Sequence, residues 1–81
     1  MSDGRLPRDA PLPRVLAALA RLGFTEVRRG NHIALVRTNP DGTRTPMTLP
    51  NHRTLKASTL QTVLRQAGIP RDAFLRAYEE R

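Results

Sequence analysis

The stretch RRGNHIALVR, residues 28–37, decides the expected fold because it predicts a turn between two strands. TEVRR at 25–29 precedes the turn, and HIALVRT at 32–38 follows it. Both segments are rich in residues that favour strands. Gly30 and Asn31 lie between them, and such a pair can supply the positive φ angles of a tight hairpin turn. We therefore expect an antiparallel hairpin with positive φ at these two residues.

The second strand of this hairpin has two different faces, because side chains alternate along a strand. One face carries Ile33 and Leu35 together with Arg37. The other carries His32 and two further apolar residues. The chain has only one other histidine, His52. The sequence thus places a histidine at the start of an apolar strand, on the face opposite Ile33.

A second turn and a third strand follow the hairpin. NPDG at 39–42 combines residues typical of turns. TRTPMTLP at 43–50 then predicts a strand. Pro46 inside this segment has no N–H group to donate, so we expect the strand at a sheet edge or at a bulge. NHRTLKAS at 51–58 is expected to form a loop.

Two amphipathic helices flank the strands. PLPRVLAALARLGF at 11–24 repeats apolar residues at helical spacing, with prolines at its start and Gly23 suited to the position after its end. STLQTVLRQAG at 58–68 shows the same spacing. Ser58 is a favourable N-cap residue, and Gly68 suits the end of this helix.

A short third helix is predicted from IPRDAFLRAYEE at 69–80, with Pro70 near its first turn. Its apolar side comprises Phe74, Leu75 and Tyr78. The order α-β-β-β-α with this added helix predicts an α+β fold, in which a three-stranded antiparallel sheet has two helices on one face. We expect one domain over residues 11–81, after a flexible lead-in over residues 1–10 that is rich in proline, glycine and charge.

The chain is strongly basic, with a formal net charge of +7, and 13 of its 14 basic residues are arginines. Eight basic residues lie from Arg21 to Arg65, against only Glu26 and Asp41, so the excess lies inside the domain. This balance favours a polyanionic partner. A coding bias towards arginine is the alternative explanation of the same composition.

Composition also excludes several classes of protein. The chain has no cysteine, which excludes disulfides and thiolate metal sites. No apolar run is long enough to span a membrane, and the N-terminus lacks the apolar region of a secretory signal. We expect a cytoplasmic protein with no membrane partner.

Three pieces in register resemble the HicA (YcfA-like) toxins of type II toxin–antitoxin systems. They are a helix ending in LGF at 22–24, Gly-Asn-His at 30–32 opening the second strand, and LPNHRTLKASTLQTVLRQAGI at 49–69. The last is similar to the family's Pro-x-His loop and the Thr-Leu-led helix that follows it. Two departures stand out: Ser58 replaces the usual glycine, and the third helix extends past the usual end of short members.

The resemblance implies a double-stranded-RNA-binding-domain-like fold and an endoribonuclease, or mRNA interferase, that cleaves mRNA without the ribosome. It also implies control by a HicB-type antitoxin protein. The functional histidine of the family falls on His32. RNA carries its own nucleophile, the 2′-OH, so one histidine that exchanges a proton at cellular pH is the simplest catalytic group. A passive strand histidine is the alternative.

Neighbouring polar residues are expected to bind RNA. Arginines can hold a phosphate through two hydrogen bonds and offset the charge of the transition state. Free N–H groups at a helix start can also cradle a phosphate. The candidate RNA-binding residues are Arg28, Arg29, Asn31, Arg37, His52, Lys56, Ser58 and Thr59.

Several alternatives stay open at this point. The sequence alone does not decide which arginines share the face of His32. His52 could assist His32 or be solvated, and Lys56 could simply precede the helix. Two histidines make a poor metal site, so we expect no metal and no small-molecule cofactor. The same fold could also serve as a non-catalytic RNA-binding module or as a basic domain that binds an acidic protein.

Overall fold

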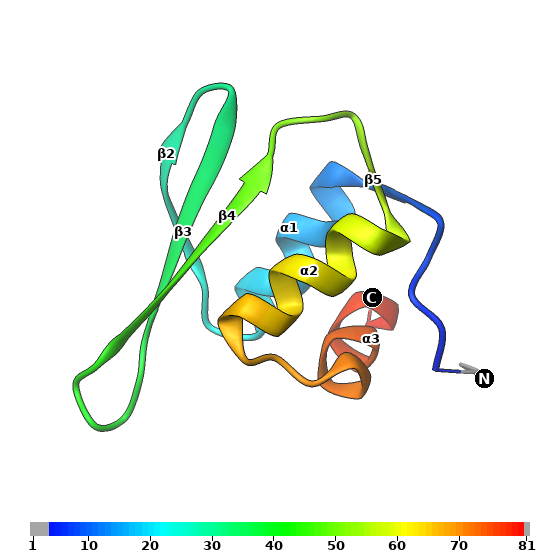
Figure 1. Ribbon diagram of the computed structural model, residues 1–81. Coiled ribbons are helices and arrows are strands. Elements are labelled where there is room, and N and C mark those ends of the chain that lie inside the picture. The colour runs from blue at the N-terminus through cyan, green and yellow to red at the C-terminus, as the bar shows by residue number, and fades with distance from the viewer. Residues whose placement is uncertain (1–3, 81) are drawn as a thin grey trace.

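A computed structural model describes residues 4–80 and confirms the predicted α+β order. The elements are β1 (Asp9–Pro11), α1 (Leu12–Arg21), β2 (Thr25–Arg29), β3 (His32–Thr38), β4 (Arg44–Pro50), β5 (Thr54–Lys56), α2 (Ala57–Ala67) and α3 (Arg71–Glu79). Figure 1 shows the β2-β3-β4 sheet on one side of the two longer helices and α3 on the other. None of the helices in the described chain is long and apolar enough to cross a membrane.

The three-stranded sheet is antiparallel, with β3 between β2 and β4. Ile33 lies opposite Leu49, and Leu35 lies opposite Met47, so these four side chains share one face. All four are buried. This face packs towards the helices, as the alternation along β3 predicts. β4 forms an edge of the sheet, which confirms the position expected from Pro46.

The two turns that end in glycine follow the predicted chemistry. Gly23 has a φ of 96°, and the Phe24 N–H donates to the Leu19 carbonyl oxygen at 3.0 Å, which closes the end of α1. Gly42 has a φ of 89° in the NPDG turn, where the Asn39 N–H donates to the Thr43 carbonyl oxygen at 2.7 Å. Both positions require the left-handed backbone that glycine adopts without strain.

A small second sheet was not expected. β1 pairs antiparallel with β5, and Ala10, opposite Leu55, is completely buried. The flexible lead-in expected over residues 1–10 therefore does not extend to Asp9 and Ala10, and the loop expected over residues 51–58 contains β5. Residues 1–3 of the lead-in lie outside the described chain. Short strands that pair only with each other give little local signal, because each is defined by a partner over 40 residues away.

The helix α2 also starts earlier than expected, next to this second sheet. The helix begins at Ala57, and Lys56 is its N-cap residue with extended φ and ψ angles of −74° and 155°. Ser58 was expected to be the N-cap but lies inside the first turn, and its carbonyl accepts a hydrogen bond from Thr62 Oγ1 at 3.0 Å. The pairing of Lys56 with Asp9 keeps residue 56 extended and lets the helix start directly after it.

The third helix packs against α1, and its predicted apolar side is confirmed. Phe74, Leu75 and Tyr78 are buried. The guanidinium carbon of Arg14 lies 4.0 Å from the centre of the Tyr78 ring, and Arg21 Nη1 donates to the Ala77 carbonyl oxygen at 2.9 Å. Two arginines of α1 therefore hold α3 in place.

Candidate nucleic-acid interface

The turn that carries His32 differs from the expected tight hairpin. Arg29 lies opposite Ile33, so three residues separate the paired positions, and the Gly30 N–H donates to the His32 carbonyl oxygen at 3.0 Å. Neither Gly30 nor Asn31 has a positive φ. The expectation of positive φ was wrong because it assumed a two-residue loop, and the mirror-image turn is required only there.

His32 lies on the face of the sheet opposite the buried apolar pair and is exposed. Ala34, the next residue on this face, lies opposite both Arg28 on β2 and Thr48 on β4. Directly opposed residues of antiparallel strands point to the same side. Arg28 therefore shares the face of His32. We call this surface the open face, defined by Arg28, His32, Ala34, Val36, Thr48 and Pro50.

Arg28 is the arginine of this stretch that the structure leaves unpaired. It is exposed, and its guanidinium makes no ion pair, hydrogen bond or ring contact within residues 4–80. The side chain of His32 likewise makes no hydrogen bond within these residues. An unpaired guanidinium and an exposed imidazole thus lie on one surface, which suits an external phosphate.

Arg29 lies on the opposite face and is already paired. Its Nη2 and Nε atoms donate to the two carboxylate oxygens of Glu26 at 2.6 and 3.1 Å. These hydrogen bonds, together with the positive charge, hold the pKa of the Glu26 carboxyl below its usual range. The same contact raises the pKa of Arg29. Glu26 is therefore the ion-pair partner of Arg29 and not an acid–base partner of His32.

We call the side of the sheet that carries the buried Ile33 and Leu35 the covered face. Arg37 lies on this covered face of β3, where its side chain is half-buried. Its guanidinium carbon lies 4.9 Å from the centre of the Phe24 ring, and its Nε donates to Asn39 Oδ1 at 3.1 Å. Contacts of this kind restrict both the position and the hydration of the guanidinium. The structure thus separates Arg29 and Arg37 from His32, although all three lie within ten residues.

A residue that the sequence patterns missed joins the two histidine-bearing segments. The Asn51 N–H donates to the Asn31 carbonyl oxygen at 3.1 Å, and Asn51 Nδ2 donates to the Gly30 carbonyl oxygen at 2.8 Å. His32 also lies opposite Pro50, and the His52 N–H donates to the Pro50 carbonyl oxygen at 2.9 Å. The loop of His52 is therefore attached directly to the turn of His32.

Three of the expected RNA-binding residues line one shallow hollow near the start of α2. His52, Lys56 and Thr59 surround it with Asp9, Thr54 and Leu55, and its volume is about 230 Å³. Ser58 is exposed but does not line it. Asp9 adds a carboxylate opposite Lys56, which the sequence patterns did not associate with this site.

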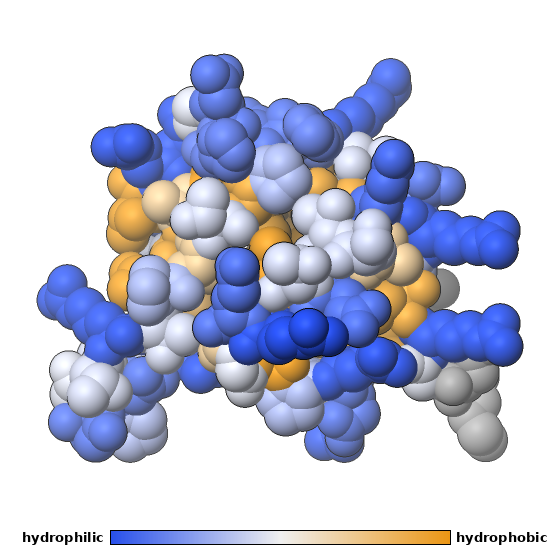
Figure 2. Space-filling model, in the orientation of Figure 1, coloured by the Kyte–Doolittle hydropathy of each residue, from blue (hydrophilic) through white to orange (hydrophobic). Residues whose placement is uncertain are grey.

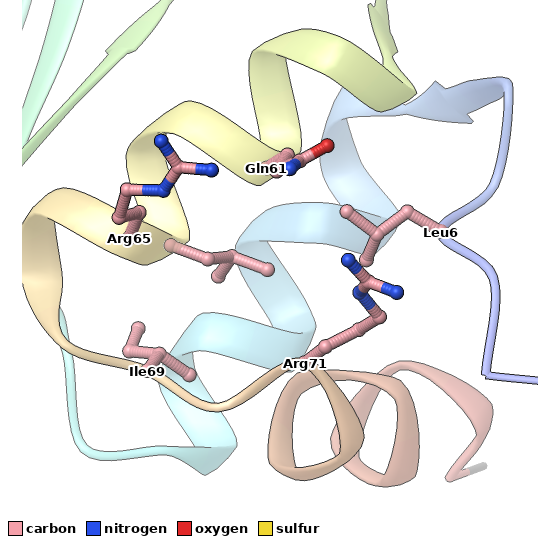
Figure 3. Close-up of a pocket in the computed structure, with 6 residues that line it drawn as sticks. Leu6, Gln61, Arg65, Ile69 and Arg71 are labelled. Atoms are coloured by element: carbon pink, nitrogen blue, oxygen red, sulfur yellow. The ribbon is translucent and has the colours of Figure 1, made fainter.

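A separate cleft of about 160 Å³ lies on the flank of α2 that faces away from β4. Leu6, Leu64 and Ile69 supply its apolar surface, and Figure 3 shows Gln61, Arg65 and Arg71 around it. The flank of α2 that faces β4 carries different residues, Val63 and Gln66. In Figure 2 hydrophilic side chains project around patches of apolar surface across this side of the molecule. This cleft is distinct from the open face of the sheet.

Comparison with known proteins identifies the family. The profile of the family described as HicA toxin of bacterial toxin–antitoxin matches residues 13–69, which are more than half of the chain. No curated protein matches the sequence. The matched segment contains the turn of His32, the loop of Asn51 and the whole of α2, and it ends before α3. The chain therefore belongs to the HicA toxin family of bacterial toxin–antitoxin systems.

Proposed function

We propose that this toxin is a ribosome-independent mRNA endoribonuclease and that His32 is its catalytic residue. The observation that carries the proposal is the placement of His32, which is exposed on the open face beside an unpaired Arg28. A strand histidine with a purely structural role would normally hydrogen-bond or pack inside the protein. His32 instead presents its ring to solvent, where a strand of RNA could reach it.

The reaction needs little from the protein beyond proton transfer and charge stabilisation. The RNA 2′-oxygen attacks the adjacent phosphorus while His32 accepts the 2′-OH proton. The bond from phosphorus to the 5′-oxygen breaks, and the 5′-oxygen takes a proton from the imidazolium. The products are a 2′,3′-cyclic phosphate and a 5′-OH end. In this proposal Arg28 binds the phosphate oxygens, whose charge grows in the transition state.

The RNA path of the proposal runs from the open face to the hollow at α2. Arg28 and Asn31 stand beside His32, and the loop through Pro50 leads to His52 and Lys56. Ser58 and Thr59 in the first turn of α2 add hydroxyl groups next to the helix N–H groups. We leave Arg29 and Arg37 out of this RNA path, since binding a phosphate would cost each its present partner.

The partner of the toxin is proposed to be a HicB-type antitoxin that covers the open face. A basic surface that binds RNA attracts an acidic protein surface through the same charges. Direct coverage of His32 would stop cleavage without any change of shape in a domain this small. Both mRNA and a freshly made antitoxin are in the cytoplasm, where we place this activity.

Induced expression of the wild type beside His32→Ala tests the function directly. Growth arrest and loss of intact mRNA are expected for the wild type and not for the variant. Arg76→Ala serves as the control, because it removes an exposed side chain of α3 that belongs neither to the open face nor to the proposed RNA path. A variant at position 32 that degrades mRNA as the wild type does would exclude His32 from the reaction.

A second candidate is an RNA-binding module that does not cleave. It is favoured by the open face itself, since no carboxylate within residues 4–80 forms a hydrogen bond or ion pair with His32. Purified protein separates the two candidates, because both bind RNA but only an endonuclease shortens an RNA oligonucleotide. The 2′,3′-cyclic phosphate end identifies the proposed route.

A further inference from the structure

The turn that carries His32 is fixed by a residue from outside the hairpin. Asn51 lies 21 residues beyond Gly30, yet it binds two consecutive carbonyl groups of the turn. Its backbone N–H holds the carbonyl of Asn31 at 3.1 Å, and its side-chain amide holds the carbonyl of Gly30 at 2.8 Å. One asparagine thus fixes the peptide planes on both sides of Asn31.

These contacts bear on His32 through the geometry of the peptide bond. A peptide unit is planar, so the carbonyl of Asn31 lies in one rigid plane with the nitrogen and Cα of His32. The carbonyl of Gly30 fixes the preceding plane in the same way. Rotation of either plane would move the Cα–Cβ bond of His32 and hence its imidazole. The direction of the His32 side chain is therefore coupled to the hydrogen bonds made by Asn51.

Apart from these bonds, the turn has its own Gly30-to-His32 hydrogen bond and the pairing of His32 with Pro50, but few packing contacts. All five residues of β2 are exposed, and the pairing of β2 with β3 shifts register between Glu26 and Arg28. Gly30 and Asn31 are themselves exposed. A turn with so few packing contacts is open to motion unless hydrogen bonds restrain it. Asn51, carried by the loop that follows β4, supplies two such bonds.

We propose that Asn51 is a positioning residue that sets the orientation of His32, an inference that rests on the proposed function. It does not act on the RNA itself. Its side-chain amide orients the turn so that the imidazole meets the 2′-oxygen and phosphorus of the bound strand. A misplacement of about 1 Å can lower a catalytic rate about a hundredfold, so a single peripheral hydrogen bond can matter at this position.

Substitution can separate the two hydrogen bonds of Asn51. The backbone N–H remains in any variant other than proline, so replacement of the side chain removes only the contact to Gly30. Asn51→Ala deletes the amide, and Asn51→Asp keeps the shape but places an acceptor against the Gly30 carbonyl. Asn51→Gln keeps an amide donor and serves as the conservative variant.

The matched control is Asn39→Ala, at the turn on the other end of β3. Asn39 Nδ2 donates to the side-chain oxygens of Thr43 and Thr45 at 3.1 and 2.9 Å, and neither contact involves the turn of His32. This variant removes asparagine hydrogen bonds from the same sheet while leaving those of Asn51 in place. Loss of rate through general weakening of the sheet would appear in both variants.

The experiment combines cleavage kinetics on a single-stranded RNA oligonucleotide with NMR signals of the His32 ring. For Asn51→Ala and Asn51→Asp we expect kcat to fall about tenfold to a hundredfold, while KM and RNA affinity change less than about twofold. The His32 ring signals should shift or broaden without RNA present. Asn51→Gln should retain more of the rate than Asn51→Ala, and Asn39→Ala should change neither kcat nor these signals.

Three outcomes would overturn the proposal. Unchanged kcat and ring signals in Asn51→Ala would show that the side chain positions nothing. A loss of RNA affinity with unchanged ring signals would make Asn51 a direct RNA contact. Global unfolding of Asn51→Ala and Asn51→Gln would make it a structural residue. If the wild type does not cleave RNA, the proposed function fails, yet the ring signals still show whether Asn51 orients His32.

Discussion

The two faces of the β2–β3 hairpin use similar residues in different ways. On the covered face Arg29 is bound to Glu26, and Arg37 packs over the ring of Phe24. On the open face the side chains of Arg28 and His32 have no such partner within the described residues. All of these residues except Phe24 lie within twelve consecutive positions. Nearness in sequence therefore groups residues that the pleat of the sheet separates.

The difference teaches which arginine is available to a ligand. An arginine that binds a phosphate must first leave the groups that already hold it. Arg29 would give up a two-bond contact with a carboxylate, which is the geometry that guanidinium groups favour most. Arg28 has no protein partner within the described residues, so it gives up only water when it binds a phosphate. The comparison therefore predicts that equal substitutions on the two faces have unequal effects on RNA binding.

The largest effect is expected at His32. His32→Ala should lower kcat for RNA cleavage by about 10²–10⁴-fold, the usual contribution of a positioned acid–base group. The fold should persist, because the side chain of His32 is exposed. Cleavage of an RNA oligonucleotide by the purified variant measures the rate, and circular dichroism checks the fold. Full activity of the His32→Ala variant would show that the open face has no catalytic role through His32.

Charge reversal on each face tests the proposed masking by the antitoxin. Arg28→Glu should weaken binding of both RNA and the proposed antitoxin, and slow their association most at low salt. Arg29→Glu is the matched control. It loses the pairing with Glu26 but should weaken the binding of RNA and of the antitoxin less than Arg28→Glu does. Affinity and association rate for each partner provide the measurement. If Arg28→Glu lost RNA binding but kept the antitoxin at its full association rate, the two partners would use separate surfaces.

Neutral substitution sharpens the comparison through salt dependence. With about four to six phosphates bound, log K for single-stranded RNA should fall with log salt at a slope of about −3 to −4. Arg28→Ala should reduce the steepness of that slope by about 0.7, the share of one phosphate on a single strand. Arg29→Ala should leave it unchanged. Equal slopes for both variants and the wild type would exclude Arg28 from the RNA contacts.

The smallest effect concerns the ion pair on the covered face. The pKa of Glu26 is lowered in the folded chain, so its contribution to stability is present above the pKa of the unfolded chain. That contribution is lost as the pH falls through the lower, folded value. NMR titration should show the pKa of Glu26 rising towards its ordinary value in Arg29→Ala. An unmoved titration would mean that the pair does not form in solution.

Local patterns in the sequence predicted much of the fold. The spacing of apolar residues located α1 and α2, and alternation along β3 assigned Ile33 and Leu35 to the core and His32 to the other side. Gly23 marked the end of α1, and Pro46 marked an edge strand. These features depend on neighbours within one or two turns of chain, so they can be recognised without knowing the rest of the structure.

The tertiary structure alone decided how the site is assembled. The register of β2 against β3 placed Arg28 beside His32 and turned Arg29 away. The pairing of β1 with β5 moved the N-cap position of α2 from the expected Ser58 to Lys56. Asn51 reached back to the turn of His32 across 21 residues. Each of these depends on which distant segments meet and in what register. Helical and strand periodicities carry no information about that pairing, because they repeat unchanged whichever partner lies opposite.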